Sequence, residues 1–316
     1  MAKSRFLIQT ISLILMILLV SFFYLQIGPQ HVDFSQLFSN SVVLDLRLPR
    51  LISLYLVAIL LSSSGFLVQL LTRNPIAEMT TLGISGGASF ALSLLMVLGL
   101  ATGGFTAILF ASAGAIAALF IVLFLTQKSK FHPLKLVLVG TSIGLFTTSL
   151  ASALTFSTHD TQSYFLWIVG SFSGITALKL EFLAGTVVIF LLLLFFYASQ
   201  INLLALGDDM AKSLGVSVNF VRFVMMFLVA IASGVTVASV GVIAFVGLIA
   251  PHIARYFGAH GFWDKFALSN LTGILLLMIC DFIAKNAFAP YEFPVGALCM
   301  LCGGIFFLIL LKKELT

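Results

Sequence analysis

Residues 223–254 read FVMMFLVAIASGVTVASVGVIAFVGLIAPHIA, a run of 32 residues without a single Asp, Glu, Lys or Arg. A helix needs about 20 apolar residues to cross a hydrocarbon core of about 30 Å. This run is therefore too long for one ordinary span and short for two. Because it contains Gly234, Gly241 and Gly247, it predicts a broken or tightly turned pair of helices, with the loose backbone buried in protein.

The rest of the chain has the same character. Of its 316 residues, 61% are hydrophobic and only 9% are charged, whereas a soluble domain carries roughly 25% charged residues. A soluble protein of this length would need polar side chains to cover its exterior. The composition predicts an all-α polytopic membrane protein, with about ten transmembrane helices in a single transmembrane domain over residues 1–316.

Ten apolar runs mark the expected helices, and a further segment at 160–176 is too short to cross and is expected to be re-entrant or interfacial. The runs are 6–26, 51–71, 82–100, 103–126, 134–157, 180–199, 219–239, 240–258, 267–288 and 294–311.

The basic residues predict the orientation. With an even number of spans both termini share one side, and that side receives twelve of the 16 Lys and Arg residues. The positive-inside rule then places both termini in the cytoplasm. The other side keeps Arg47, Arg50, Lys179 and Lys285. The net charge of +5 is explained by orientation and lipid head groups, and no basic patch suggests nucleic acid as a partner.

The three cysteines, Cys280, Cys299 and Cys302, all lie inside apolar runs. Cys299-x-x-Cys302 has the spacing of a redox or metal motif but lacks a second ligand pair. We interpret all three as small packing residues and expect no metal site.

A polar island interrupts the apolar sequence at about 205–216 and contains Gly207-Asp-Asp-Met-Ala-Lys-Ser-Leu-Gly215. Asp208 and Asp209 suit the first turn of a helix, Gly215 suits its end, and Met210, Ala211 and Leu214 would form one apolar stripe. The pattern fits either an interfacial loop helix or a coupling helix that docks into a cytoplasmic ATPase.

Several motifs resemble those of the FecCD family of import permeases, over residues 45 to 311. They are Arg47-Leu-Pro-Arg50, Asn74-Pro-Ile-Ala-Glu78, Leu82-Gly-Ile-Ser-Gly-Gly-Ala88, Asp209-x-Ala211-x-x-x-Gly215, the stretch from Gly241 to Arg255 with its Phe-Val-Gly-Leu-Ile-Ala-Pro-His, Asp281, and Pro294-Val-Gly296.

The resemblance implies a fold like that of cobalamin-importer permeases, in a prokaryotic plasma (inner) membrane. It also implies a second permease subunit (a homodimer or a paralogue), two ATP-binding-cassette ATPases below and an extracytoplasmic substrate-binding protein above. The cargo expected first is an iron-siderophore, with haem or cobalamin as alternatives. ATP and Mg would bind the partner ATPase, so this chain needs no cofactor and no catalytic residue, and we find no phosphate-cradling glycine loop in it.

Arg47 and Arg50 are expected on the outer face, either as interfacial anchors or as docking residues for carboxylates of the binding protein, which the resemblance implies. Lys285 stands where the family often has another Arg. Lysine keeps the charge but loses the planar fork.

Asn74, Pro75 and Glu78 follow the second span. They form either a capped tight turn, because Pro75 stops the helix, or a hinge or cytoplasmic gate, to which Gly83 and Gly86 would contribute.

Pro251, His252 and Arg255 end the eighth span, where we expect a structural or ATPase-contact role rather than a metal. Asp281 is a charge inside a span, hence a functional candidate. Lys285, four residues later, is its expected partner.

Two other classes of protein compete with an ATP-driven importer. A secondary transporter would bury ionisable residues at the midplane, and Asp281 is the only acidic residue that could plausibly do so. An intramembrane enzyme would need a nucleophile with its base or a metal cluster, and the sequence presents neither.

Overall fold

The computed structural model describes residues 2–28, 31–36, 39–100, 104–127, 132–156, 168–257, 261–287, 289 and 291–314. Helices are found at all ten predicted apolar runs, and seven of the described helices are long and apolar enough to cross a membrane. The helices are α1 Ala2–Gln26, η1 Phe34–Gln36, the π-helix η2 Val42–Arg47, α2 Leu48–Thr72, α3 Ile84–Val97, α4 Gly104–Thr126, α5 Pro133–Phe156, α7 Ala177–Leu204, α8 Asp208–Ser213, α9 Val218–Val240, α10 Val246–Tyr256, α11 Phe262–Asn286 and α12 Val295–Glu314.

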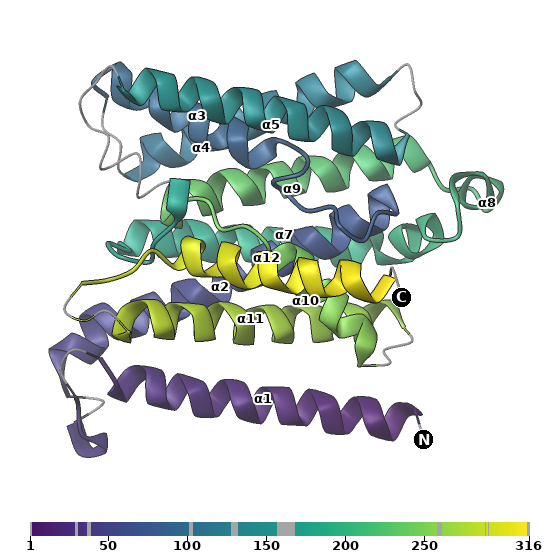
Figure 1. Ribbon diagram of the computed structural model, residues 1–316. Coiled ribbons are helices and arrows are strands. Elements are labelled where there is room, and N and C mark those ends of the chain that lie inside the picture. Colours follow the sequence, from purple (N-terminus) through teal and green to yellow (C-terminus); the bar gives the residue numbers. More distant parts are fainter. Residues whose placement is uncertain are drawn as a thin grey trace.

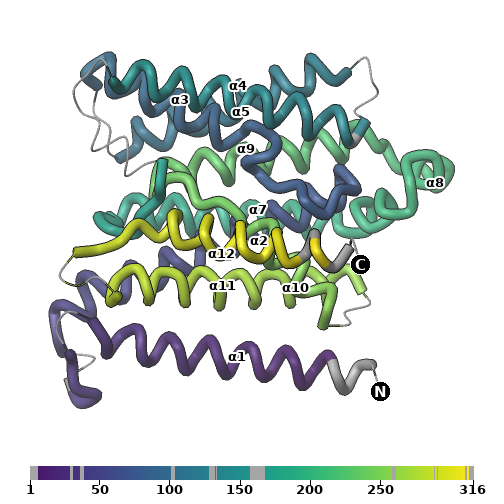
Figure 2. The backbone as a smooth tube through the Cα atoms, viewed as in Figure 1, coloured from purple at the N-terminus to yellow at the C-terminus, as the bar shows by residue number. Residues whose placement is uncertain are grey.

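The long helices run side by side in stacked layers (Figures 1 and 2). Helices α3, α4 and α5 form one outer layer, α1 lies at the opposite edge, and the remaining long helices lie between them. α1 contacts α2 and α11 through Ser21, whose hydroxyl lies 2.6 Å from the Tyr55 hydroxyl and 3.5 Å from Met278 Sδ.

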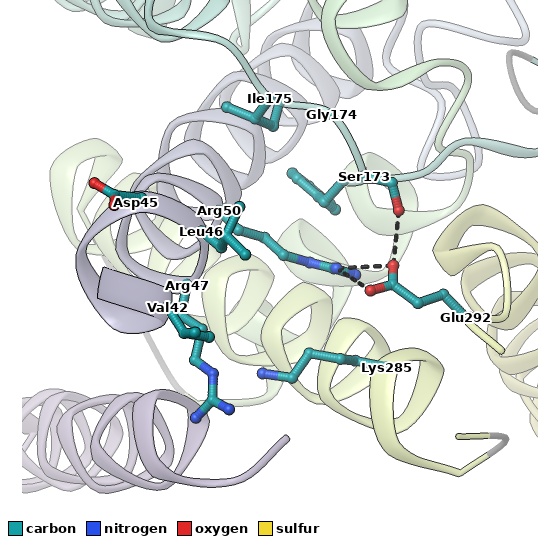
Figure 3. A pocket seen from close by; sticks show the side chains of 11 residues that line it. Val42, Asp45, Leu46, Arg47, Arg50, Ser173, Gly174, Ile175, Lys285 and Glu292 are labelled. Atoms are coloured by element: carbon teal, nitrogen blue, oxygen red, sulfur yellow. Dashed lines mark hydrogen bonds and ion pairs between the residues drawn. The ribbon is translucent and has the colours of Figure 1, made fainter. Parts of the chain in front are cut away.

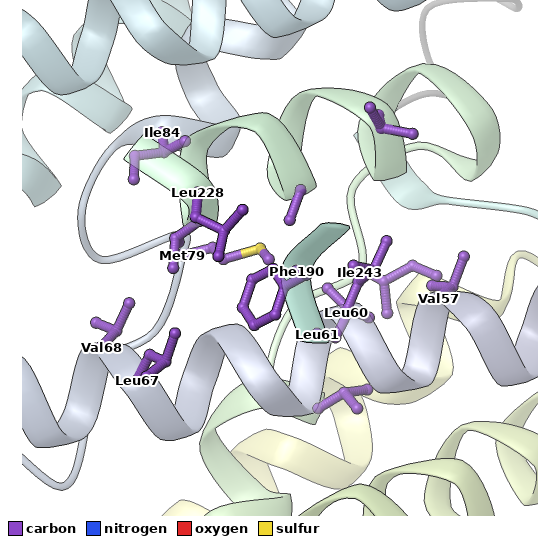
Figure 4. Packing of buried hydrophobic residues seen from close by; sticks show 14 of the residues in the cluster. Val57, Leu60, Leu61, Leu67, Val68, Met79, Ile84, Phe190, Leu228 and Ile243 are labelled. Carbon is purple, nitrogen blue, oxygen red and sulfur yellow. The ribbon is translucent and has the colours of Figure 1, made fainter. Parts of the chain in front are cut away.

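α2 is the centre of the packing, because its side chains are buried around most of the helix. A helix that is apolar all round belongs in a core. Figure 4 shows this core, in which α2 meets residues from α7, from α9, from the segment between α2 and α3 and from the segment between α9 and α10. The labelled side chains are Val57, Leu60, Leu61, Leu67, Val68, Met79, Ile84, Phe190, Leu228 and Ile243.

The predicted break within 223–254 is confirmed. α9 ends at Val240 and α10 begins at Val246, with Gly241 at φ 79° and Phe245 at φ 69°. The single span predicted at 240–258 is therefore wrong at its start. α10 has 11 residues, which at 1.5 Å per residue cover about 16 Å and cannot cross a bilayer alone.

A second break separates α2 from α3, over residues 73–83. Arg73 is left-handed at φ 48°, and the Asn74 side chain accepts a hydrogen bond from the Ile76 amide at 3.1 Å. The capped turn predicted around Pro75 is therefore present. Of the segment predicted at 160–176, residues 160–167 lie outside the described part of the chain. Residues 170–176 form an irregular segment with a turn at 173–174, and the Ser171 amide donates to Val240 O at 2.8 Å.

Both ends of the chain lie at one end of the bundle, together with α8 (Figure 1). We call this the terminal end. The start of α2 and the junction of α11 with α12 lie at the other end, which we call the pocket end.

Candidate functional site

The three predicted docking residues meet around one pocket at the pocket end. Arg47 and Arg50 come from η2 and the start of α2, and Lys285 comes from the last turn of α11. Together with residues of the 172–175 segment and Glu292, they line a pocket of about 530 Å³ (Figure 3).

Arg50 is held between two carboxylates. Its Nε and Nη2 donate to the two oxygens of Asp281 at 3.1 and 2.9 Å, and its Nη1 donates to both oxygens of Glu292 at 2.9 and 2.8 Å. The planar guanidinium fork suits such paired bonds. Asp281 is fully buried and also accepts the Tyr24 hydroxyl at 2.5 Å.

The predicted pairing of Asp281 with Lys285 is wrong, because Arg50 is the ion-pair partner of Asp281. Arg50 supplies two donors at once, whereas an ammonium is a single point charge. Lys285 Nζ instead donates to Tyr24 O at 3.3 Å and lies 4.3 Å from the centroid of the Tyr24 ring. A cation over an aromatic face is attracted by the ring.

Arg47 is buried and turned toward α1. Its Nη1 donates to Leu25 O at 2.6 Å and to Gln26 O at 2.9 Å. These are carbonyls of the last turn of α1, which have no partner within their own helix. Arg47 therefore ties the end of α1 to the start of α2.

Glu292 is a site residue that sequence reasoning missed. Burial alone would raise the pKa of its carboxyl, but the Arg50 guanidinium and the Ser173 hydroxyl, which donates at 2.7 Å, hold that pKa below its usual value. The signal that could have found it is a lone acidic residue in an outer loop opposite two arginines. That signal does not specify which arginine it meets.

At the terminal end, α8 is anchored through its first residue. Asp208 accepts a hydrogen bond from Arg73, at the end of α2, and bonds of 3.1 and 3.2 Å from Arg222 of α9. Gly215 follows the helix at φ 82°, as predicted for its end. Sequence reasoning used Arg73 and Arg222 only as orientation charges.

The predicted apolar stripe of α8 is wrong in one respect. Ala211 is fully buried, whereas Met210 and Leu214 are more than half exposed. In this short helix Ala211 points inward against the bundle, while Met210 and Leu214 share the outer face with Asp209. The outer face is an exposed apolar knob with charged neighbours.

Glu78 connects the two helix breaks. Its buried carboxylate accepts the Thr80 hydroxyl at 2.6 Å and the Phe245 amide at 3.0 Å, so it lies at the N-terminus of α10. A carboxylate there is stabilised by the helix dipole. The segment predicted as a turn or gate is thus fixed to the start of α10.

Three further contacts fix α10 against α2 and α12. Arg255 donates to Gln69 of α2, and the same Gln69 amide donates to Leu248 O at 3.2 Å. His252 packs its ring against Phe306, 5.6 Å between centroids, and Pro251 is buried inside α10. This geometry fits the structural role predicted for Pro251, His252 and Arg255.

Gly83 and Gly86 face α5. A Cβ on Gly83 would lie 2.9 Å from the Gly144 amide nitrogen, and one on Gly86 would lie 2.8 Å from Gly144 O. Gly83 is also left-handed, at φ 72°. Close helix approach through small residues is common in membranes, so both glycines carry the α3–α5 contact.

The three cysteines are free thiols on α11 and α12. Within the ranges that the structure describes, no three His, Cys, Asp or Glu side chains are grouped so that they could hold a metal ion.

The fold defines a polytopic helical membrane protein with a polar site at each end of its bundle. Residues 11–313 match the model of the FecCD transport family, and the chain belongs to that family.

Known relatives agree with this assignment. The iron(3+)-hydroxamate import system permease protein FhuB of Bacillus subtilis is 36% identical over 280 residues, which cover 87% of this chain and 72% of that protein. The ferric enterobactin transport system permease protein FepG of Escherichia coli is 31% identical over 325 residues, which cover 98% and 97% of the two chains.

Solved structures share the fold. An inward-facing metal-chelate type ABC transporter matches with a TM-score of 0.87 at 26% identity, over 96% of this chain and 98% of that one. PsaBC from Streptococcus pneumoniae matches with a TM-score of 0.65 at 20% identity, over 87% and 92%.

Proposed function

We propose that this chain is the permease subunit of an ATP-binding-cassette importer that moves an iron(III) chelate, such as an iron-siderophore, from an extracytoplasmic binding protein into the cytoplasm. The observation that carries the proposal is α8, an exposed apolar knob held by an ion-paired Asp208 at the end of the bundle opposite the charged pocket. A stiff projection of this kind can transmit the movement of a docked ATPase to α2 and α9, to which Asp208 is ion-paired.

The remaining parts of the importer are assigned by the same reasoning. The terminal end faces the cytoplasm, following the positive-inside rule, and binds two ATPase subunits that hydrolyse ATP. The pocket end receives the binding protein. A second permease subunit, either a copy of this chain or a paralogue, completes the path. The relatives' names refer to iron hydroxamates and enterobactin, which favours an iron-siderophore over haem or cobalamin.

The outer face of α8 provides the test. Leu214→Glu places a charge on the apolar knob, where Leu214 is 55% exposed, and so should not disturb folding. In the reconstituted permease–ATPase complex, we expect cargo-stimulated ATP hydrolysis and uptake to fall at least about tenfold, because burying an unpaired charge at an interface is costly.

The melting temperature of the permease serves as the control for folding, and co-purification of the ATPase reports whether the substitution weakens docking itself. Coupled uptake at the unmodified rate in Leu214→Glu would remove α8 from the coupling role.

A further inference from the structure

The two carboxylates on Arg50 differ in how accessible they are. The Asp281 side chain is fully buried, whereas the Glu292 side chain is 39% exposed. Asp281 binds Nε and Nη2 of the guanidinium, whereas Glu292 binds Nη1 and lines the pocket together with Arg50 (Figure 3). The inner pair, with Asp281, is part of the packed bundle, and the outer pair, with Glu292, is the one that another molecule can reach.

Glu292 also has few hydrogen-bond partners beyond Arg50 among the described residues. It lies between α11 and α12, and outside the Arg50 pair the structure gives its carboxylate one partner, the Ser173 hydroxyl. The Glu292 side chain is 39% exposed, so water screens this pair more than it screens the fully buried Asp281 pair. Breaking the outer pair therefore costs less than breaking the inner one, provided that another carboxylate replaces Glu292 on Arg50.

We propose that Glu292 is an internal stand-in for an acidic side chain of the binding protein, and that docking exchanges one carboxylate for the other on Arg50. The proposal rests on the proposed function, in which the binding protein docks at the pocket end. The pocket suits a carboxylate because its lining carries three cations, Arg47, Arg50 and Lys285, against two carboxylates, Asp45 and Glu292. An incoming acidic group therefore meets a net positive lining.

The exchange would also change the contacts at the start of α12, the helix that follows Glu292. Glu292 lies three residues before Val295, the first residue of α12. The next residue, Gly296, donates its amide to Gly170 O at 3.3 Å, within the segment that also carries Ser173. When Glu292 leaves Arg50, the Ser173 hydroxyl no longer connects to Arg50 through the Glu292 carboxylate. The start of α12 and the segment that contains Gly170 and Ser173 are then both uncoupled from Arg50.

The test compares two substitutions that remove the same charge from the same pocket. Glu292→Gln removes the carboxylate that competes with the binding protein's acidic side chain for Arg50. Asp45→Asn is the matched control, because Asp45 is exposed, lines the same pocket, points away from Arg50 in Figure 3 and forms no ion pair among the described residues. The readout is the Kd of the importer's purified binding protein for the assembled permease–ATPase complex in lipid nanodiscs.

We expect Glu292→Gln to lower this Kd by about fivefold, which is the effect of freeing Arg50 from a pair worth about 1 kcal/mol. Asp45→Asn should change it by less than about twofold at physiological salt, where exposed charges are screened. Arg50→Lys keeps a cation for buried Asp281, loses the fork, and should raise the Kd and abolish the effect of Glu292→Gln.

Two results would overturn the inference in different ways. If Arg50→Lys weakens binding but Glu292→Gln leaves it unchanged or weakens it, docking at Arg50 stands and the exchange is wrong. If neither substitution alters binding, docking at this pocket is wrong, and the exchange fails with it.

Discussion

At the scale of single residues, the molecule depends on one buried ion pair. Asp281 is fully buried and Arg50 is 12% exposed in its side chain, so each charge needs the other. Removing one member of such a pair strands the other in a low-dielectric environment. The pair also joins α2 to α11, and through Tyr24 it reaches α1.

Asp281→Asn should therefore destabilise the protein by about 3 kcal/mol, because it leaves Arg50 with Glu292 alone and keeps the shape of the side chain. The measurement is denaturant unfolding in mixed micelles. The exposed Asp33, with 77% side-chain exposure, supplies the control. Asp33→Asn should shift the free energy of unfolding by no more than about 0.5 kcal/mol, and an equal shift in both variants would refute the buried-pair argument.

The sequence identifies these residues but not their pairing. A charge inside an apolar run marks Asp281, and an Arg-Leu-Pro-Arg motif marks Arg50. Helical periodicity then favours Lys285, one turn from Asp281. The true partner is 231 residues away, and only the packing of α2 against α11 brings it close. The same holds for Glu78, whose partner Phe245 is 167 residues away.

At the scale of elements, the two shortest α-helices of the described chain are held by carboxylates. α8 depends on Asp208, and α10 begins beside Glu78. A helix of six or 11 residues is marginal alone, so tertiary anchors decide whether it keeps its place. The sequence signals predicted the position and end of α8, but they could not show which side of it faces the bundle.

Asp208→Asn should loosen α8. Asp208 pairs with the partly exposed Arg73 and the buried Arg222. Losing both pairs should cost at least about 1 kcal/mol, so amide hydrogen exchange over residues 208–216 should become at least about fivefold faster. Asp209→Asn is the matched control, because Asp209 occupies the same first turn, is exposed and forms no ion pair within the described residues. Equal acceleration in both variants would show that dipole stabilisation, and not the Arg73–Asp208–Arg222 contact, holds α8.

The α2–α10 contact depends on Gly65 and Gly247, whose backbones touch. A Cβ on Gly65 would overlap the Gly247 carbonyl, and one on Gly247 would lie 2.8 Å from Leu61 O. Gly65→Ala should therefore destabilise the protein by about 1–3 kcal/mol through overpacking.

Gly185→Ala is the opposite case, because Gly185 lies within α7 with nothing within 4 Å of the added methyl. There the substitution should stabilise the helix by up to about 1 kcal/mol. Thermal unfolding of both variants checks the contrast in sign, and a stabilised Gly65→Ala variant would contradict the close α2–α10 approach.

At the scale of the whole molecule, an apolar bundle separates two polar ends. One carries α8 and the termini, and the other carries the Arg50 pocket (Figure 1). Composition and apolar runs predicted the bundle, a helix at each of the ten apolar runs and a break within 223–254. They could not predict that α10 is too short to span, because the break depends on Phe245 adopting a left-handed conformation beside Glu78.

The proposed importer requires ATP hydrolysis by a partner subunit to drive cargo through this bundle. The most direct measurement is uptake of a radiolabelled ferric chelate into proteoliposomes that contain the permease, its ATPase and its binding protein. Uptake should require ATP in the lumen of the vesicles, which takes the place of the cytoplasm. It should persist when ionophores collapse every ion gradient. Uptake that proceeds on an ion gradient without ATP or the ATPase would contradict the account and identify a secondary transporter instead.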